Sequence, residues 1–138
     1  MKWLYERLYK SERGFTLIEL LIVIIILAVL AGIAIPSYLT ITARAKESGT
    51  ESEMANIATA LELYNADNGS YPAALSSLSP NYMSTVPTND KWGNAYVYAQ
   101  TGGGTGYTLT SKGKDGTAST ADDIVWTNGQ QTSFGAYK

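Results

Sequence analysis

An unbroken apolar run near the N-terminus constrains this chain more than any other feature. From Leu20 to Ile35, sixteen residues carry no charge and no strong hydrogen-bonding side chain; counted from Phe15, the run has twenty-one residues with Glu19 as its one charge. An α-helix rises about 1.5 Å per residue, so the run is roughly 30 Å long and spans a bilayer core. A buried helix of a soluble protein would show a polar stripe, and this run shows none. The run therefore predicts a transmembrane helix.

Positive charge is concentrated ahead of the apolar run. Of the ten Lys and Arg and twelve Asp and Glu in the chain, residues 1–14 hold four and two, which leaves the remainder with a formal net charge of −4. Since an excess of Lys and Arg marks the cytoplasmic side of a span, we expect a cytoplasmic N-terminus and a C-terminal part across the membrane. An acidic body without a Lys/Arg cluster argues against nucleic acid as the main partner.

The chain contains neither Cys nor His. We therefore expect no disulfide, no catalysis by a thiol or an imidazole, and no zinc site of the usual Cys/His kind. A Ser-His-Asp triad is excluded as well. No other constellation of residues supports catalysis, and the sequence predicts a protein that is not an enzyme.

Beyond the apolar run, the sequence remains compatible with a helix as far as the Asn68-Gly69 pair. Pro36 should introduce a kink, and Gly49 is a soft spot because Gly costs about 1 kcal/mol against Ala in a helix. Spacings of three and four place four apolar residues on one helical face: Met54, Ile57, Leu61 and Tyr64. We therefore predict one long helix over roughly 15–68, apolar in its first half and amphipathic in its second.

Residues 70–138 have the pattern of a small sheet. A helical turn is expected at 73–78, and alternating β-branched and aromatic residues predict three strands, at 95–98, 107–110 and 124–126. The Gly-rich segment 101–106 should join the first two strands as a hairpin loop, and residues 130–138 should be weakly ordered. The predicted fold class is α+β, a long N-terminal helix packed on a small antiparallel sheet.

Glu19 is a carboxylate inside an apolar run, and three interpretations of it compete. It lies close enough to the membrane surface to reach water, or it belongs to an ordinary secretory signal peptide, although such a peptide has a shorter apolar core followed by a small-residue cleavage site. In the third interpretation the chain is cut between Gly14 and Phe15. An unpaired carboxylate in hydrocarbon costs several kcal/mol, and the freed amine of a neighbouring subunit would neutralise it during lateral assembly.

The N-terminal segment resembles the signature of type IV pilins and type II secretion pseudopilins. It has a basic leader ending in Gly14, then Phe15, then Glu19 at the fifth position of the apolar span, with Pro36 where these families usually have a proline. The resemblance implies that a prepilin peptidase cleaves after Gly14 and N-methylates Phe15. It also implies that Phe15 and Glu19 take part in filament assembly.

The same resemblance divides the chain into three parts. Residues 1–14 would be a leader peptide that is cleaved off, and residues 15–36 a helix that lies in the membrane before assembly and in the filament core afterwards. Residues 37–138 would be a periplasmic or extracellular globular domain.

The C-terminal half resembles, more narrowly, the major pseudopilin of type II secretion. The matching segments are Asp90–Tyr98, Ser111–Gly116 and Ala121–Ile124. Two departures stand against this branch: Lys91 and Ala95 occupy positions where that family often has Pro, and the segment after Tyr71-Pro72 is shorter than usual. Neither departure argues against the resemblance to type IV pilins and type II secretion pseudopilins as a whole.

The segment Lys112–Asp123, called the acidic loop below, is a candidate calcium site. Three carboxylates within nine residues repel one another unless a cation binds, and hard oxygen ligands suit Ca²⁺; the spacing is not that of an EF-hand, and a solvated acidic turn is the alternative. The resemblance implies ligation by the side chains of Asp115 and Asp122, more weakly Thr117, and by the backbone carbonyls of Lys112 and Asp123. A small core without disulfides would gain stability from such an ion.

Two classes of function follow. The first is a structural filament subunit without catalysis, held in the bacterial inner membrane by a single span before assembly. Its partners would be copies of itself in a helical homopolymer, minor pilins or pseudopilins, the prepilin peptidase and the inner-membrane assembly platform. The filament would be the periplasmic pseudopilus of type II secretion or a surface type IV pilus for adhesion, motility or DNA uptake. The second class is a monomeric membrane-anchored binding module with an uncleaved anchor.

Overall fold

A computed structural model of the chain describes residues 14–137. Apart from Gly14, the predicted leader lies outside the described residues, and so does Lys138. The chain divides between Leu39 and Thr40 into two compact units.

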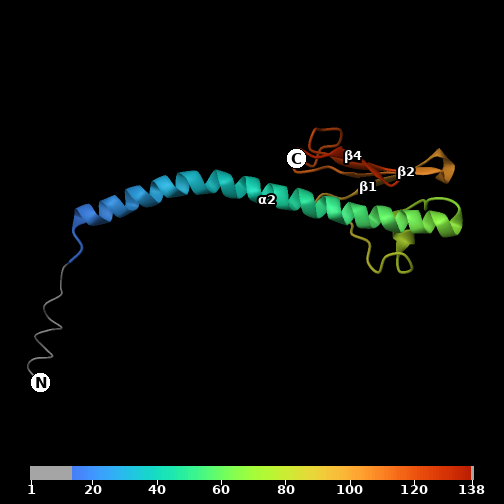
Figure 1. The fold of residues 1–138 in the computed structure, drawn as a ribbon, viewed down its shortest axis with the longest axis horizontal. Helices are drawn as coiled ribbons and strands as arrows, with labels where there is room; N and C mark the ends of the chain where they lie inside the picture. Colours follow the sequence, from blue (N-terminus) through green and yellow to red (C-terminus); the bar gives the residue numbers. More distant parts are fainter. Residues whose placement is uncertain (1–13, 138) are drawn as a thin grey trace, which may run out of the picture. The chain divides into compact units, whose positions relative to one another are not determined.

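Helix α2, Leu17–Asn68, supplies most of the described part of the first unit and continues into the second (Figure 1). It runs through Pro36, as predicted for a single long helix. Every Leu, Ile and Val between Leu17 and Leu39 is at least 44% exposed. Within residues 14–137 it is the one helix long and apolar enough to cross a membrane. Apolar surface on this scale needs lipid or other protein chains to cover it.

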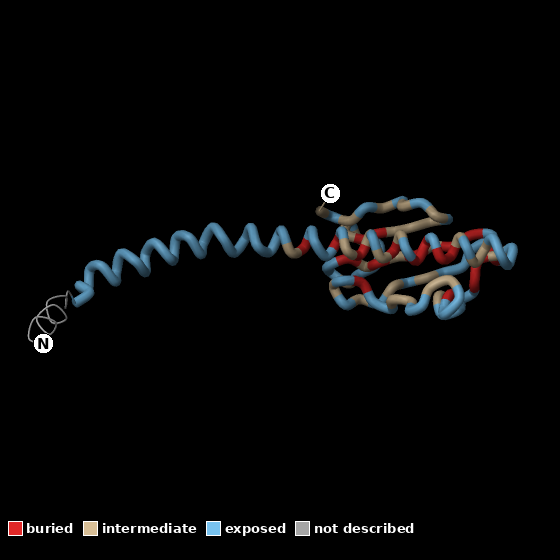
Figure 2. The backbone as a smooth tube through the Cα atoms, turned by 60° about the horizontal axis from the view of Figure 1, so that its bottom comes forward, coloured by how far each residue is buried: buried red, intermediate tan, exposed pale blue. Residues whose placement is uncertain are grey.

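In the second unit, the predicted face of α2 forms the core (Figure 2). Met54, Ile57 and Leu61 are fully buried, and Tyr64 packs against them from a half-buried position. The rest of the chain covers this face with one cluster of buried residues: Tyr71, Leu78, Tyr107, Leu109 and Ile124. The period of three and four residues therefore identified the buried face correctly.

Four antiparallel strands pack on α2 in the order β1-β2-β3-β4. Their bounds are Val97–Thr101, Gly106–Ser111, Ile124–Thr127 and Gln130–Phe134. The three predicted strands are confirmed with small shifts, and the Gly-rich hairpin loop contains the 3₁₀ turn η3, Gly102–Gly104. A second 3₁₀ turn, η2, Leu75–Leu78, occupies the predicted helical turn.

The expectation of a weakly ordered C-terminus was wrong, because β4 pairs with β3. Asn128 and Gly129 join them with φ of 49° and 78°. A two-residue Asn-Gly turn with positive φ at both positions is the strongest short-range hairpin signal. Apolar alternation does not predict this strand, because its residues, QQTSF, are mostly polar.

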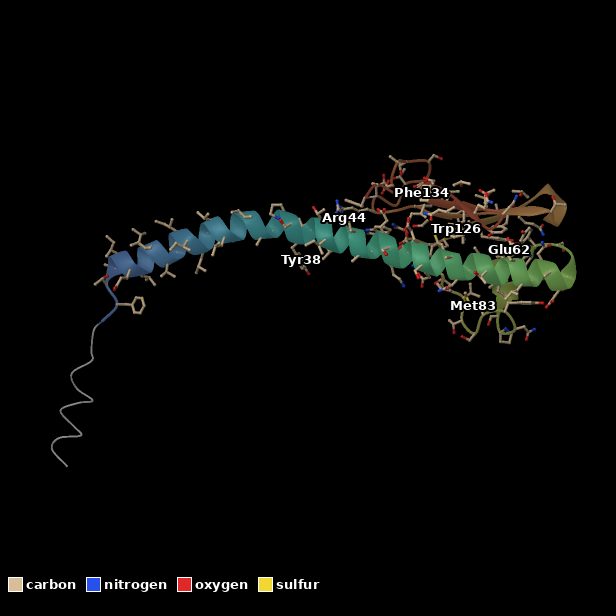
Figure 3. All side chains as sticks on the ribbon, in the orientation of Figure 1. Tyr38, Arg44, Glu62, Met83, Trp126 and Phe134 are labelled. Atoms are coloured by element: carbon tan, nitrogen blue, oxygen red, sulfur yellow. The ribbon has the colours of Figure 1, made fainter. Side chains whose placement is uncertain are left out.

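Polar contacts tie α2 to its surroundings in the second unit. The Tyr71 hydroxyl donates to Glu62 at 2.9 Å, and Glu53 accepts from the Tyr96 hydroxyl at 2.9 Å and forms a 3.0 Å ion pair with Lys91. Figure 3 places Met83, from the loop after η2, on the side of α2 away from Trp126 of β3. The helix is therefore held between the sheet and this loop.

Candidate functional site

The first candidate site is the segment from Gly14 to Glu19. Helix α2 begins at Leu17, which makes Thr16 its N-cap residue. The Glu19 carboxylate accepts hydrogen bonds from the Thr16 amide at 2.8 Å and the Thr16 hydroxyl at 2.9 Å, and the Glu19 amide donates to the Thr16 hydroxyl oxygen at 3.2 Å. This reciprocal arrangement is a capping box, which satisfies two of the amides that a helix N-terminus leaves open.

Thr16 is the residue that the sequence interpretation of Glu19 missed. The third interpretation places the partner of this carboxylate on a neighbouring subunit, and the structure gives the carboxylate two donors at the start of its own helix. The signal was present, because Thr-x-x-Glu directly ahead of an apolar run is the pattern of a capping box. A negative charge at this position is also favoured by the helix dipole.

Both donors of Thr16 bind the same carboxylate oxygen, Oε2. Within residues 14–137, the other oxygen of Glu19, Oε1, accepts no hydrogen bond. Phe15, just ahead of the helix, is 80% exposed. The predicted cleavage position, between Gly14 and Phe15, therefore lies outside the helix, and Glu19 has one oxygen left for a further donor.

The second candidate site is the acidic loop, which connects β2 to β3, and its centre is Thr120. The Thr120 hydroxyl oxygen lies 2.8 Å from Asp122 Oδ1, 3.1 Å from Asp123 Oδ1 and 3.4 Å from Asp115 Oδ1. It also lies 2.9 Å from the carbonyl oxygen of Thr117. A hydroxyl has one proton and donates to one of these oxygens at a time. The remaining contacts set lone pairs against lone pairs, which a bound cation would relieve.

Backbone amides hold the three carboxylates of the acidic loop in place. The Asp115 amide donates to Asp122 Oδ2 at 3.1 Å, the Thr117 amide to Asp115 Oδ1 at 2.7 Å, and the Ser119 amide to Asp123 Oδ2 at 2.7 Å. Each carboxylate is therefore oriented by hydrogen bonds from the loop's own backbone.

The electrostatics of the acidic loop favour ionised Asp122. Burial raises the pKa of this carboxyl, but hydrogen bonds from the Asp115 amide, the Thr120 hydroxyl, and the amides of Asp122 and Lys114 outweigh the burial, so its pKa lies below the usual value. The loop thus presents a carboxylate, the form that ligates a metal ion.

Of the predicted ligand residues, Asp115, Thr117, Asp122 and Asp123 surround Thr120. The Thr117 carbonyl oxygen faces the Thr120 hydroxyl, and the Asp123 carbonyl accepts a hydrogen bond from the Ser133 hydroxyl at 2.8 Å. Lys112 directly follows β2. Across residues 14–137, no three Asp, Glu, His or Cys side chains are arranged to hold a metal ion. The donors that are present, two carboxylates with hydroxyl and carbonyl oxygens, match the hard ligands of Ca²⁺.

The acidic loop is bonded to the turn Asp90–Asn94. Asp90 is 5% exposed and accepts hydrogen bonds from the amides of Trp92 and Asn94, at 3.0 and 2.9 Å, and from the Ser111 hydroxyl at 2.7 Å. The Asn94 side-chain amide donates to the Gly113 carbonyl at 2.7 Å. Two of the three segments that carry the narrower resemblance, Asp90–Tyr98 and Ser111–Gly116, are thus joined by hydrogen bonds.

Comparison with known proteins gives two matches to family models. The model of type II secretion system protein G matches residues 37–127, and that of the prokaryotic N-terminal methylation motif matches residues 9–35. The second match contains Gly14, Phe15 and Glu19.

Individual relatives agree with the family models. The chain is 33% identical to the type II secretion system core protein G of Escherichia coli (strain K12), over 83% of this chain and 90% of that protein. The proteins of the same name from Pseudomonas aeruginosa and Vibrio cholerae are each 30% identical over 83% of this chain, covering 92% and 91% of those proteins. No solved structure matches the chain significantly.

Proposed function

Because the chain belongs to the type II secretion system protein G family, we propose that it is a structural subunit of the pseudopilus of a type II protein secretion system. Two matches together carry this proposal. Protein G matches most of the second unit, called the globular unit below, and the methylation motif matches the N-terminal segment. The family consists of structural pseudopilins and is not known for catalysis, in keeping with the absence of Cys and His. The Lys91 and Ala95 departures do not move the chain out of this family.

The surface through which the subunit polymerises is the apolar part of α2. Its side chains between Leu17 and Leu39 are exposed and contain no charge other than Glu19. Before assembly this surface would lie in the inner membrane, with the N-terminus in the cytoplasm. In the periplasmic filament the same surface would pack against the helices of neighbouring copies and minor pseudopilins.

The N-terminal site would act in two steps. A prepilin peptidase would cut between Gly14 and Phe15 and methylate the new α-amine of Phe15, which is accessible ahead of the helix. The positive α-amine of a neighbouring subunit would then approach Oε1 of Glu19. Thr16 supports this step because it holds the carboxylate by Oε2 and leaves Oε1 open.

We also propose that the acidic loop binds Ca²⁺. Asp115 and Asp122 would supply carboxylates, and the carbonyls of Lys112 and Asp123 would join the first and last residues of the loop to the ion, with Thr117 as a further ligand. When bound, the ion would neutralise the crowded oxygens around Thr120. Its role would be structural, since it links the two ends of a loop in a chain that has no disulfide.

The mature N-terminus and the secretion phenotype test the proposed function. Sequencing of the purified subunit should find N-methyl-phenylalanine from position 15, whereas an intact Met1 would indicate a permanently anchored monomer. Deletion of the gene should abolish release of exoproteins. Loss of long surface fibres on electron micrographs, with secretion intact, would assign the subunit to a pilus instead.

A further inference from the structure

Strand β4 and the residues after it lie beyond the region matched by the protein G family, which ends at residue 127. We propose that residues 130–137 form a C-terminal clasp, a segment that fastens the beginning of the second unit's helix to the sheet. The clasp meets the proposed cation site at the Asp123 carbonyl, and its other contacts lie outside the acidic loop and within one subunit. It rests on three sets of contacts.

The first set fixes the turn that leads into the clasp. The Asn128 side-chain oxygen accepts a hydrogen bond from the Tyr107 amide at 2.8 Å, and the Gly129 amide donates to the Tyr107 hydroxyl oxygen at 2.9 Å. Tyr107 is fully buried in the core. The direction in which the chain leaves the turn is therefore set by a core residue.

The second set bonds β4 on two sides. The Gln131 side-chain amide donates to Glu51 of α2 at 2.8 Å, across eighty residues of sequence. The Ser133 hydroxyl donates to the Asp123 carbonyl at 2.8 Å, at the end of the acidic loop. Strand β4 thus joins the helix to the beginning of β3 in addition to its ladder with β3.

The third set brings residues 135–137, called the tail below, onto helix α2. Gly135 has a φ of 78°, which favours glycine, and a Cβ there would lie 2.8 Å from the Glu47 carboxyl carbon, so a side chain at this position would displace the Glu47 carboxylate. The Tyr137 amide donates to both carboxylate oxygens of Glu47, at 3.0 and 3.3 Å. Glu47 is 4% exposed. A buried carboxylate is costly unless it is hydrogen-bonded, and the tail supplies such a bond.

The consequence concerns the helix ahead of the hydrophobic core. On α2, the core cluster begins at Met54. Glu47 lies about two helical turns before Met54 and is covered by the tail. Figures 1 and 2 show the C-terminal end of the chain beside the part of α2 where the first buried residues of the helix occur. The clasp therefore extends the covered face of the helix toward the N-terminal end of the second unit.

A matched pair of neighbouring glutamines tests the clasp in the full chain in detergent micelles. Gln131→Ala removes the bond to Glu51, whereas Gln130→Ala alters an exposed side chain of the same type on the other face of β4. We expect Gln131→Ala to lower the melting temperature of the globular unit by roughly 4–8 °C and Gln130→Ala to leave it nearly unchanged. Equal effects of the two substitutions would overturn the proposal.

Hydrogen exchange followed by mass spectrometry tests the tail. Residues 130–137 should exchange roughly tenfold or more slowly than an unstructured peptide. Glu47→Ala should remove the protection of the tail and leave β1 to β3 protected. Since Glu47→Ala could unfold the unit, a chain ending at Phe134 serves as the second variant and should lose the protection of β4 in part. Exchange of residues 130–137 at the unstructured rate in the unaltered chain would also overturn the proposal.

Discussion

Thr16 donates both of its hydrogen bonds to one oxygen of Glu19, Oε2, from its amide at 2.8 Å and from its hydroxyl at 2.9 Å. The carboxylate that the proposed function uses between subunits is thus already oriented within one subunit. The cap and the intersubunit pair are compatible because they use different oxygens. Substitutions at the two positions should separate these roles.

Thr16→Ala should weaken assembly without abolishing it. Loss of an N-cap threonine costs roughly 0.5–2 kcal/mol of helix stability, and the Glu19 carboxylate would lose one of its two donors. We expect a severalfold lower yield of sheared filaments, measured against total subunit in the membrane. Thr16→Ser keeps the hydroxyl and should assemble normally; an equal loss in both variants would mean that the threonine methyl group, and not the cap, matters.

Glu19→Gln should abolish filaments. The glutamine oxygen can still accept the bonds from Thr16, so the cap persists, but the side chain has no charge to pair with a neighbour's α-amine. Membrane insertion, cleavage after Gly14 and methylation of Phe15 should be unchanged, which separates an assembly defect from a processing defect. Normal filaments from this variant would contradict the proposed charge pair.

Calcium should stabilise the globular unit. Binding to the folded state alone contributes about 2.7 kcal/mol when free Ca²⁺ is one hundred times Kd, so the melting temperature should rise in millimolar Ca²⁺ relative to EGTA. Asp115→Asn and Asp122→Asn should remove this difference, and Mg²⁺ should not replace Ca²⁺ because it demands a smaller octahedral site. Equal melting temperatures in Ca²⁺ and in EGTA would exclude the site.

The sequence predicts the fold well where the signal is apolar and periodic. The run from Leu20 to Ile35 and the face at Met54, Ile57 and Leu61 identify the helix and its buried side. Strand β4 has no such pattern. Its local signal is the Asn128-Gly129 pair ahead of it, and its polar residues are held by a turn on Tyr107 and by a bond from Gln131 to a residue eighty positions away. Contacts of this range cannot be read from local pattern.

The candidate sites divide in the same way. The role of Thr16 is local and readable from its spacing to Glu19. The place of Thr120 at the centre of the acidic loop is not readable, because the residue is uncharged and its position depends on how the loop folds around it. Acidic residues mark where a cation would be attracted, and the backbone decides which oxygens meet.

Alkaline pH should destabilise the globular unit between about pH 10 and pH 12. The pKa of Tyr107 is raised from 10.0 to about 12, chiefly by burial. The hydrogen bond from the Gly129 amide lowers this pKa, whereas the neighbouring Glu62, Tyr71 and Tyr98 raise it. Because the folded state holds the phenolic proton more tightly than the unfolded state, this stability is complete below pH 10 and is lost as the pH rises toward 12.

Melting curves of the full chain in detergent, recorded from pH 9 to pH 12, measure this loss. Tyr107→Phe should be less stable at pH 9, since the Gly129 amide loses its acceptor, but should lose less stability over the range. Tyr38→Phe, outside the globular unit, is the control and should follow the unaltered chain. A pH dependence unchanged by Tyr107→Phe would refute the assignment to this residue.

Gly49 provides a test in which sequence and structure predict different outcomes. From sequence, Gly49→Ala should stabilise the helix by about 1 kcal/mol. In the structure, a Cβ at Gly49 would lie 3.3 Å from Cγ of Lys91. The Lys91 amide donates to the Thr50 hydroxyl oxygen at 3.2 Å, and the Lys91 ammonium forms an ion pair with Glu53 at 3.0 Å. Lys91 is held at both ends, so its stem can move aside only by loosening these contacts.

We therefore expect Gly49→Ala to stabilise the chain by well under 1 kcal/mol, and the same substitution in a Lys91→Ala background to give the full helical gain. The four melting temperatures of this double-mutant cycle measure the coupling between the two positions. Additive effects would show that the Lys91 side chain moves aside without cost, and Gly49 would then destabilise the helix only through its low helix propensity. A larger gain from Gly49→Ala in the Lys91→Ala background than in the unaltered chain would show that the glycine provides the space through which this lysine crosses α2.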